Sequence, residues 1–298
     1  MRALQTLHEI SKKLSPLNIE NPAREAEIIL HQGLNMDLVE MYRDNPEINN
    51  DQTALIEKMI DRRAGREPLQ YITGQTDFLG LKISVGQGVL IPRPETELMA
   101  EQAIQKLGSK KHREQKTDNR QLTTDSTEPM TILDLCTGSG CLALALAKNF
   151  PDSQVCGIDI SEAALEYAAK NAEANEIGNI KFLKGDLFSA LGQNRTFDLI
   201  ISNPPYIRRD EIRDLQPEIR EWEPLNALDG GEDGLDFYRE IIPAAREHLK
   251  ENATLMFEVG FDGADNVACI FENAGYHDIQ ITKDYSKIKR IVHAQWTR

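Results

Sequence analysis

The 298-residue chain contains only four cysteines, Cys136, Cys141, Cys156 and Cys269, and none of them forms a C-x-x-C pair. Without paired histidines either, this pattern predicts neither a zinc site nor a disulfide framework and favours a reducing compartment. No apolar run reaches the length of a membrane span, and the first ten residues lack the apolar core of a secretory signal. We therefore expect a cytoplasmic protein with no metal and no membrane contact.

Basic residues are also in short supply. The chain has 34 lysines and arginines against 48 aspartates and glutamates, which gives a net charge of −14. Such a balance disfavours nonspecific attraction to phosphate backbones, so a direct nucleic-acid substrate is not expected. A hydrophobic content of 40% supports a folded core and excludes a disordered protein.

The first part of the chain predicts a small helical bundle over residues 1–75. Apolar residues recur there at helical spacing, Asn21-Pro22 is typical of a helix start, and Gly33 of a helix end. Residues 78–92 predict a β-hairpin with glycines at its turn, inside a linker of residues 76–93. A helix over 94–107 then opens a third region, 94–298, in which the polar residues 108–129 predict a flexible surface insertion.

From residue 131 onward, apolar strands alternate with amphipathic helices. This alternation predicts an α/β fold with a parallel sheet covered by helices on both faces, which binds ligands at the carboxyl ends of its strands. The expected strands are 131–135, 154–158, 181–183, 197–202 and 253–259, with two more around Gln280 and Val292; the expected helices are 141–149, 161–174, 235–250 and 263–274.

Polar residues at the ends of the first three of these strands predict a nucleoside pocket. The loop Asp134–Gly140 joins a strand to a helix, and its glycines permit close backbone approach to a ligand. Asp159 ends the next strand and is placed to accept hydrogen bonds from ribose hydroxyls, while Asp186 could accept from an adenine amino group. For either aspartate a helix-capping role remains an alternative.

The glycine pattern by itself leaves the cofactor open. Gly138-x-Gly140-x-x-Ala143 also satisfies the loose dinucleotide fingerprint, with Asp159 at the expected ribose distance, so a nicotinamide dehydrogenase is an alternative. Against it, Asp134 and Thr137 stand where a dinucleotide strand would be apolar. These residues, together with the motif described next, favour S-adenosylmethionine.

The motif Asn203-Pro204-Pro205-Tyr206 directly follows the apolar run 197–202. Each proline fixes its own φ and restricts the residue before it, so the backbone is stiff and extended. Carbonyl oxygens, the Asn203 amide and the Tyr206 ring remain to contact a ligand, and they suit a planar –NH₂ group. The motif recurs in enzymes that methylate amide or amino nitrogens; the alternative is a strand-terminating turn with a half-buried tyrosine.

Taken together, these residues resemble the peptide-chain release factor glutamine methyltransferase family over nearly the full length of the chain. The motifs that carry the resemblance are Pro92–Glu97, Asp134–Gly140, Ser202–Ile207 and Glu223–Leu235. The resemblance implies a Rossmann-like, seven-stranded class I methyltransferase domain behind a helical domain that holds the release factor. It also implies methyl transfer to the glutamine of the Gly-Gly-Gln tripeptide in class I release factors.

The resemblance assigns roles residue by residue. It places the cofactor loop on Cys136, Thr137, Gly138, Ser139 and Gly140, the ribose acid on Asp159, and the adenine side on Asp186 and Leu187. The substrate clamp falls on Asn203, Pro204, Pro205 and Tyr206; we expect catalytic roles for Asn203, Pro204 and Tyr206, and a second role for Asn203 beside the cofactor. Cys136 stands where many members have glycine, which asks only for a small side chain there, and Leu187 stands where some members carry an aromatic residue.

Three alternatives to this function remain at this stage. An adenine-N6 methyltransferase would use the same clamp for a flipped base, although the charge of −14 argues against it. A ribosomal-protein glutamine methyltransferase is a closer relative, against which Pro92–Glu97 favours the release factor. A catalytically idle scaffold would need a damaged site, and no expected acceptor is missing.

Overall fold

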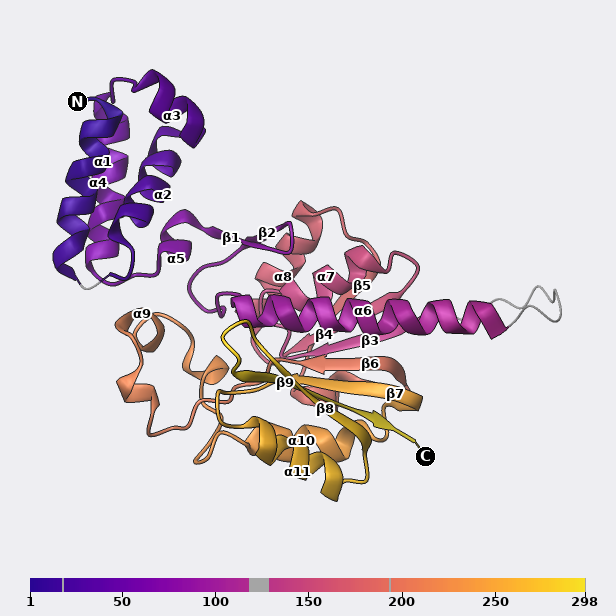
Figure 1. The fold of residues 1–298 in the computed structure, drawn as a ribbon. Helices are drawn as coiled ribbons and strands as arrows, with labels where there is room; N and C mark the ends of the chain where they lie inside the picture. The colour runs from indigo at the N-terminus through magenta and orange to yellow at the C-terminus, as the bar shows by residue number, and fades with distance from the viewer. Residues whose placement is uncertain (18, 118–128, 193, 298) are drawn as a thin grey trace. The chain divides into compact units, whose positions relative to one another are not determined.

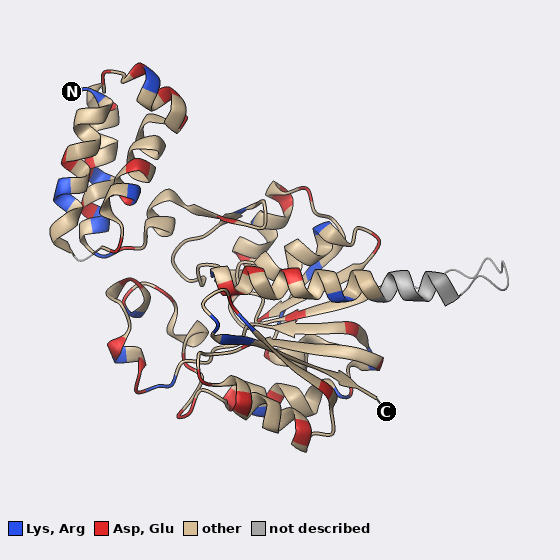
Figure 2. Ribbon diagram, viewed as in Figure 1, with Lys and Arg blue, Asp and Glu red and all other residues tan. Residues whose placement is uncertain are grey.

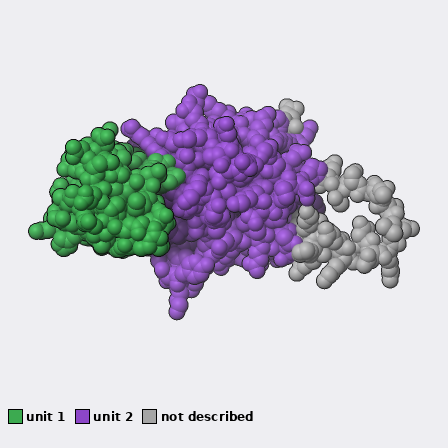
Figure 3. All heavy atoms as spheres, turned by 90° about the horizontal axis from the view of Figure 1, so that it is seen from above, with its two compact units in different colours: residues 1–75, 216–222 green, residues 76–215, 223–298 purple. Residues whose placement is uncertain are grey.

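The computed structural model describes residues 1–17, 19–117, 129–192 and 194–297, and the chain divides into two compact units (Figure 3). The helical unit comprises residues 1–75 together with the distant segment 216–222. The α/β unit comprises residues 76–215 and 223–298. We expected residues 1–75 alone to form the first unit, so segment 216–222 is an addition that the sequence pattern did not indicate.

Short helices around an apolar core form the helical unit. Its largest fully buried side chains include Ile10, Leu14, Ile29, Leu30 and Met41. The Asn21 side chain accepts a hydrogen bond from the Arg24 amide and caps the second helix, as its position before Pro22 indicates. The helices are α1 (Ala3–Leu14), α2 (Pro22–Leu34), α3 (Leu38–Asp44), α4 (Asn50–Ala64), α5 (Leu69–Thr73) and α9 (Pro217–Arg220).

Gly33 does not end a helix, contrary to the prediction. Helix α2 continues through Leu34, and Asn35 terminates it in the left-handed conformation, with φ of 49°. Gly33 faces Ile56 of α4 so closely that a β-carbon on it would clash with that side chain. The glycine therefore serves helix packing, and a short polar asparagine supplies the left-handed end.

The predicted hairpin exists, but it lies earlier in the chain than residues 78–92. Strand β1 spans Gln75–Phe78 and strand β2 spans Leu81–Ser84, which leaves residues 85–93 without strand structure. Leu79 and Gly80 form the two-residue turn, and both have positive φ, at 46° and 72°. The apolar residues after Ser84 are buried by packing, so burial and not strand pairing explains their pattern.

The central sheet of the α/β unit has seven strands in the order β5-β4-β3-β6-β7-β9-β8 (Figure 1). Its parallel strands pair in register, as in Leu133 opposite both Cys156 and Ile200. The strands are β3 (Thr131–Leu135), β4 (Gln154–Asp159), β5 (Ile180–Lys184), β6 (Phe197–Ser202), β7 (Leu249–Glu258), β8 (His277–Lys283) and β9 (Lys289–Trp296).

The sheet is mostly parallel, as expected, but β9 runs antiparallel to both of its neighbours. Only five residues separate β8 from β9, and Asp284 and Ile288 close this turn with a backbone hydrogen bond. Parallel neighbours need a crossover of a dozen or more residues, so this connection permits only an antiparallel pair.

Helices cover both faces of the sheet, as expected. Figure 1 shows α6, α7 and α8 on one face and α10 and α11 on the other. The apolar sides of α10 and α11 build a continuous core with the inner strands. Strands β4, β3 and β6 are neighbours in the sheet, so their carboxyl ends lie side by side. The helices are α6 (Pro94–Thr117), α7 (Cys141–Asn149), α8 (Glu162–Ala174), α10 (Asp236–Ala245) and α11 (Ala264–Asn273).

The prediction of a flexible insertion over residues 108–129 is wrong for residues 108–117. Helix α6 continues through Thr117, so residues 108–117 are helical, and residues 118–128 lie outside the described part of the chain. Lysine, glutamine and glutamate are good helix formers, and a polar composition suits a solvated helix as well as a loop. Polarity alone therefore could not separate the two.

Charged residues of both signs occur along the ribbon of each unit (Figure 2). Among the helices that the structure describes, none is long and apolar enough to cross a membrane. In the same residues, no group of three or more histidine, cysteine, aspartate or glutamate side chains is arranged to hold a metal ion.

Candidate active site

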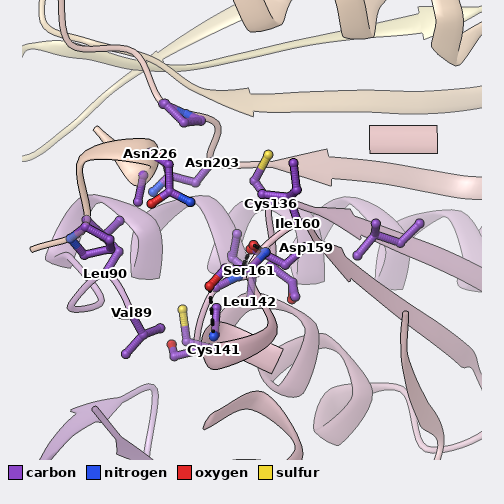
Figure 4. A pocket seen from close by; sticks show the side chains of 18 of the residues that line it. Val89, Leu90, Cys136, Cys141, Leu142, Asp159, Ile160, Ser161, Asn203 and Asn226 are labelled. Carbon is purple, nitrogen blue, oxygen red and sulfur yellow. Dashed lines mark hydrogen bonds between the residues drawn. The ribbon is translucent and has the colours of Figure 1, made fainter. Parts of the chain in front are cut away.

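A cavity in the α/β unit lies at the carboxyl ends of the parallel strands. Residues after β3, β4, β5 and β6 line it, together with residues 88–90, Pro92, Thr96, Pro224 and residues 226–227. Of the predicted cofactor residues, all but Gly140 line the cavity: Cys136, Thr137, Gly138, Ser139, Asp159, Asp186, Leu187 and Asn203. Figure 4 shows Asn203 and Asn226 on the side of the cavity away from Ser161.

The loop after β3 is organised around Asp134, which is completely buried. Its Oδ2 accepts hydrogen bonds from the Thr137 hydroxyl at 2.6 Å and the Ala143 amide at 3.2 Å, while its Oδ1 has no partner in the described residues. Burial raises the pKa of Asp134 to about 7. Gly140, at φ of 80°, turns the chain into α7 and serves as its N-cap instead of lining the cavity.

Asp159 ties the first loop to the second. Its Oδ2 accepts from the Gly138 amide and its Oδ1 from the Ser161 amide, each at 2.8 Å. Burial raises the pKa of this carboxyl above its ordinary value. The Ser161 side chain, and not Asp159, caps α8 by accepting from the Ala164 amide. Each Asp159 oxygen retains a lone pair for a further donor.

The charges around the cavity bear on the choice of cofactor. Asp159 and Asp186 line it, and no lysine, arginine or histidine does so among the described lining residues. Moreover, the Gly138 and Ala143 amides, which a dinucleotide fold would offer to a pyrophosphate, are already bonded to Asp159 and Asp134. An acidic, partly apolar cavity with these acceptors fits a nucleoside that carries positive charge, as S-adenosylmethionine does.

Cys136 and Leu187 share a backbone property that the sequence did not disclose. Both line the cavity and both have positive φ, 59° at Cys136 and 44° at Leu187. The expectation that position 136 asks only for a small side chain was therefore incomplete, because the left-handed backbone itself favours glycine there.

The four clamp residues separate into two groups. Asn203 and Pro205 line the cavity, whereas Tyr206 lines a neighbouring pocket with Gly260 and Asp262, and Pro204 is buried and lines neither. The Tyr206 hydroxyl donates to Glu258 Oε1 at 3.3 Å, and burial raises the pKa of this phenol well above its ordinary value.

Two residues without a predicted role meet the clamp. Asn203 Nδ2 donates to Thr96 Oγ1 at 3.2 Å, and the Thr96 hydroxyl donates to Glu258 Oε2 at 2.6 Å. Burial raises the pKa of Glu258 to about 7. Glu258 ends β7, so the rule that identified Asp159 and Asn203, a polar residue at the carboxyl end of a parallel strand, could also have found it.

The segment Glu223–Leu235 packs against the clamp. Ile207 and Arg209 donate backbone hydrogen bonds to Leu228 and Gly231. A β-carbon on Gly230 would lie 2.7 Å from Tyr206 Cα, so only glycine fits there. Glu223 also forms a 2.6 Å ion pair with Arg93, which joins the segment to the motif Pro92–Glu97.

Comparisons with known proteins agree with this geometry. The family model "Methyltransferase domain" matches residues 126–231, and "PrmC N-terminal domain" matches residues 5–74. A release factor glutamine methyltransferase of Thermodesulfovibrio yellowstonii is 45% identical over 99% of this chain and 98% of its own length; one from Geobacter sulfurreducens is 41% identical over 94% and 91%. A methyltransferase structure from Pyrococcus furiosus is similar in fold, with 16% identity, a TM-score of 0.51, and coverage of 84% of this chain and 100% of its own.

These matches confirm the class I methyltransferase fold, S-adenosylmethionine as the cofactor and the family to which the sequence motifs pointed. They contradict the dehydrogenase alternative, since both near-full-length relatives are named as methyltransferases. The chain belongs to the release factor glutamine methyltransferase family.

Proposed function

We propose that this enzyme methylates the side-chain amide nitrogen of the glutamine in the Gly-Gly-Gln motif of class I release factors, in the cytoplasm. Membership of the family supports the methyl transfer and the glutamine. One observation carries the assignment of the site. Asn203 lies on the cofactor cavity with its Nδ2 bonded to Thr96, which leaves Oδ1 to accept a hydrogen bond from an incoming –NH₂ group.

The chemical task is to make an amide nitrogen nucleophilic, because its lone pair is delocalised into the carbonyl. S-adenosylmethionine supplies, when bound, a methyl group on a positively charged sulfur. Asn203 Oδ1 and the Pro204 carbonyl would accept the two amide hydrogens and turn the nitrogen lone pair toward that methyl group. The nitrogen gains the methyl group and loses one proton to solvent, while the electrons of the broken carbon–sulfur bond stay on sulfur. Orientation of this kind contributes up to roughly 7–11 kcal/mol.

Each remaining clamp and cofactor residue has a proposed task. Tyr206, held by Glu258, would keep the amide plane in position. Asp159 would accept from the ribose hydroxyls and Asp186 from the adenine amino group, while the loop Cys136–Gly140 would approach the cofactor by its backbone. Leu187 would contact the adenine with an aliphatic side chain instead of a ring.

The helical unit is the proposed surface that holds the release factor. A folded protein that presents a glutamine loop to a strand-end cavity needs a second contact surface, and binding energy from a remote surface can help to align the reacting group. Segment 216–222 belongs to the helical unit, yet its chain neighbours on both sides belong to the α/β unit. A release factor that binds the helical unit would therefore contact a unit whose segment 216–222 continues in the chain into the loop around Asn226.

Two methyl acceptors are less well supported. A net charge of −14 disfavours binding of the negatively charged phosphates of a nucleic acid, and the cavity has no basic lining residue in the described structure. A ribosomal protein is not what the near-full-length relatives are named for. Both nevertheless belong in the test as competing substrates.

The test uses the full-length enzyme, labelled S-adenosylmethionine and purified class I release factor, with tRNA, rRNA, DNA and ribosomal proteins as competing acceptors. We expect label on the glutamine of Gly-Gly-Gln and on no other acceptor. Asn203→Ala should lower turnover by about 100- to 1000-fold, the effect of about 2.7–4 kcal/mol expected for an aligned hydrogen-bonding group. Its affinity for the cofactor, measured by calorimetry, should change less than about twofold. Label on nucleic acid, or an Asn203→Ala enzyme with normal turnover, would contradict the assignment.

A further inference from the structure

A chain of three polar side chains runs from the cavity into the core of the α/β unit. It starts at Asn203, passes through Thr96 and ends at Glu258, with bond lengths of 3.2 and 2.6 Å. Thr96 is 2% exposed and Glu258 is 1% exposed. The three residues come from β7, the start of α6 and the loop after β6, so only the folded unit brings them together.

The donors and acceptors in this chain permit one arrangement when Glu258 is ionised. A carboxylate only accepts, so the single hydroxyl hydrogen of Thr96 is directed to Glu258. Thr96 Oγ1 can then only accept from Asn203, which requires Nδ2 on that side. The amide of Asn203 is consequently turned with Oδ1 away from Thr96.

We propose that Thr96 and Glu258 are positioning residues that set the amide orientation of Asn203 and thereby make the enzyme select glutamine over glutamate. This inference rests on the proposed function, in which Asn203 Oδ1 accepts a hydrogen from the substrate amide. With Oδ1 presented, a glutamine –NH₂ finds an acceptor and a glutamate carboxylate meets a second oxygen. With the amide reversed, Nδ2 would face the glutamine –NH₂ as donor against donor, and glutamate would be favoured.

The burial of Glu258 fits a task in the site better than a task in stability. In the described structure no basic side chain bonds to its carboxylate; the groups that face it are the hydroxyls of Thr96 and Tyr206, with Glu95 and Arg290 acting at longer range. The Tyr238 hydroxyl bonds only to its backbone oxygen. A buried carboxylate without an ion pair lowers the stability of the fold. As a fixed acceptor behind Asn203, Glu258 offsets this cost by orienting the amide that meets the substrate.

The decisive experiment is a double-mutant cycle between Thr96→Val and Asn203→Ala, with single-turnover rates on the release factor as the readout. Thr96→Val keeps the shape of the side chain and removes the hydroxyl. We expect roughly a tenfold loss of rate in the wild-type background, the effect of one hydrogen bond, and less than about a twofold loss in the Asn203→Ala background. Thr96→Ser retains the hydroxyl and should restore most of the rate.

A second readout separates orientation from general damage. With S-adenosylhomocysteine present, the wild-type enzyme should bind a Gly-Gly-Gln peptide more tightly than a Gly-Gly-Glu peptide. Thr96→Val and Glu258→Gln should narrow that preference roughly tenfold, because either change allows the Asn203 amide to reverse. Thr254→Val, a buried threonine on β7 that does not line the cavity, is the matched control and should leave the preference unchanged.

The outcomes separate the two proposals. A wild-type enzyme that does not methylate release factor removes the proposed function. If the wild type is active and Asn203→Ala keeps only a small, measurable fraction of its rate, then equal losses from Thr96→Val in both backgrounds, or an unchanged peptide preference in Glu258→Gln, overturn the positioning role alone.

Discussion

Glu218 of the helical unit and Glu258 of the α/β unit are held in opposite ways. In the helical unit, Glu218 lies between Arg63 and Arg66, with nitrogen–oxygen distances of 2.9 and 2.6 Å. Hydrogen bonds to these guanidinium groups outweigh the effect of burial and hold the pKa of Glu218 below its ordinary value. In the α/β unit, Glu258 bonds to hydroxyls, and burial raises its pKa.

The two environments suit different tasks. Ion pairs hold one segment of the chain to another, whereas carboxyls without an ion pair suit a chemical site. Paired charges hold segment 216–222 to helices α2 and α4, because Arg63 bonds both Glu25 and Glu218. Carboxyls that have no ion pair in the described residues, such as those of Asp134, Asp159 and Glu258, lie instead at strand ends beside the proposed site of methyl transfer. Structural ion pairs keep groups in their ordinary charge state, whereas functional sites use burial to shift it.

Replacement of Arg63 should have the largest effect on the difference between the two units. Arg63 is 4% exposed and bonds two half-buried glutamates, so Arg63→Met leaves both carboxylates short of a partner; the cost should be no more than the roughly 3–5 kcal/mol typical of a fully buried pair. We expect hydrogen exchange to accelerate throughout the helical unit and segment 216–222, with turnover on a short Gly-Gly-Gln peptide little changed. Arg24→Met, at the exposed Arg24–Glu27 pair, is the control and should cost less than about 1 kcal/mol. Equal protection in both variants would mean that the buried pairs do not hold the segment.

Glu258 and Glu218 should change the free energy of unfolding in opposite directions as pH rises. The pKa of Glu258 is raised from 4.5 to about 7 in the folded state, so the stability that it contributes is complete below pH 4.5 and falls as pH rises to about 7. The loss is about 3 kcal/mol. The Glu218 contribution is present above pH 4.5 and is lost toward lower pH.

Denaturant unfolding between pH 4.5 and 8 measures this effect. In Glu258→Gln the decline with rising pH should become shallower by about 3 kcal/mol, and a decline of the same sign from Asp134 should remain. In Glu218→Gln that decline should persist. A Glu258→Gln profile parallel to that of the wild type would show that Glu258 is already ionised in the acidic range.

The smallest expected effect concerns backbone conformation. The helical unit places asparagines at its left-handed helix ends, Asn35 and Asn45, whereas the α/β unit places Cys136 in that conformation beside the cavity. Cys136→Gly should relieve this strain and raise stability by about 1 kcal/mol or less, because lost packing offsets part of the gain. Thermal melting measures it. Cys269→Gly, in helix α11, should change stability in the other direction by roughly 0.3–0.5 kcal/mol, and two changes of the same sign would argue against strain at Cys136.

Regular elements with strong local signals could be predicted from the sequence. Strand β3 at Thr131–Leu135, helix α7 at Cys141–Asn149 and strand β6 at Phe197–Ser202 have the predicted bounds. In each, an apolar run meets a loop of glycine, proline or asparagine, and these residues act through their own backbone. Most of the residues that line the cavity could be predicted in the same way, because the carboxyl ends of parallel strands share one edge of the sheet.

Other features depended on distant contacts. Gly33 was predicted to end a helix, because glycine is typical of helix ends. Its close approach to Ile56 of another helix depends on how the two helices pack, and the sequence alone does not show it. The reversed direction of β9 followed from the short turn before it. Segment 216–222 joined the helical unit through Arg63 and Arg66, more than 150 residues earlier in the chain, as the 152-residue separation of Arg66 and Glu218 shows.

The sequence by itself determined the alternation of elements, the stiff Asn203–Tyr206 loop, the acidic strand ends and, by resemblance, the family. Those properties are local, since they depend on residue types and on their spacing. Only the tertiary structure decided that Thr96 and Glu258 stand behind Asn203 and that the Glu223 segment is bound to Arg93. Hydrogen bonds between distant residues depend on which strand ends and loops lie next to each other in the fold. The order of residue types along the chain does not specify those tertiary contacts.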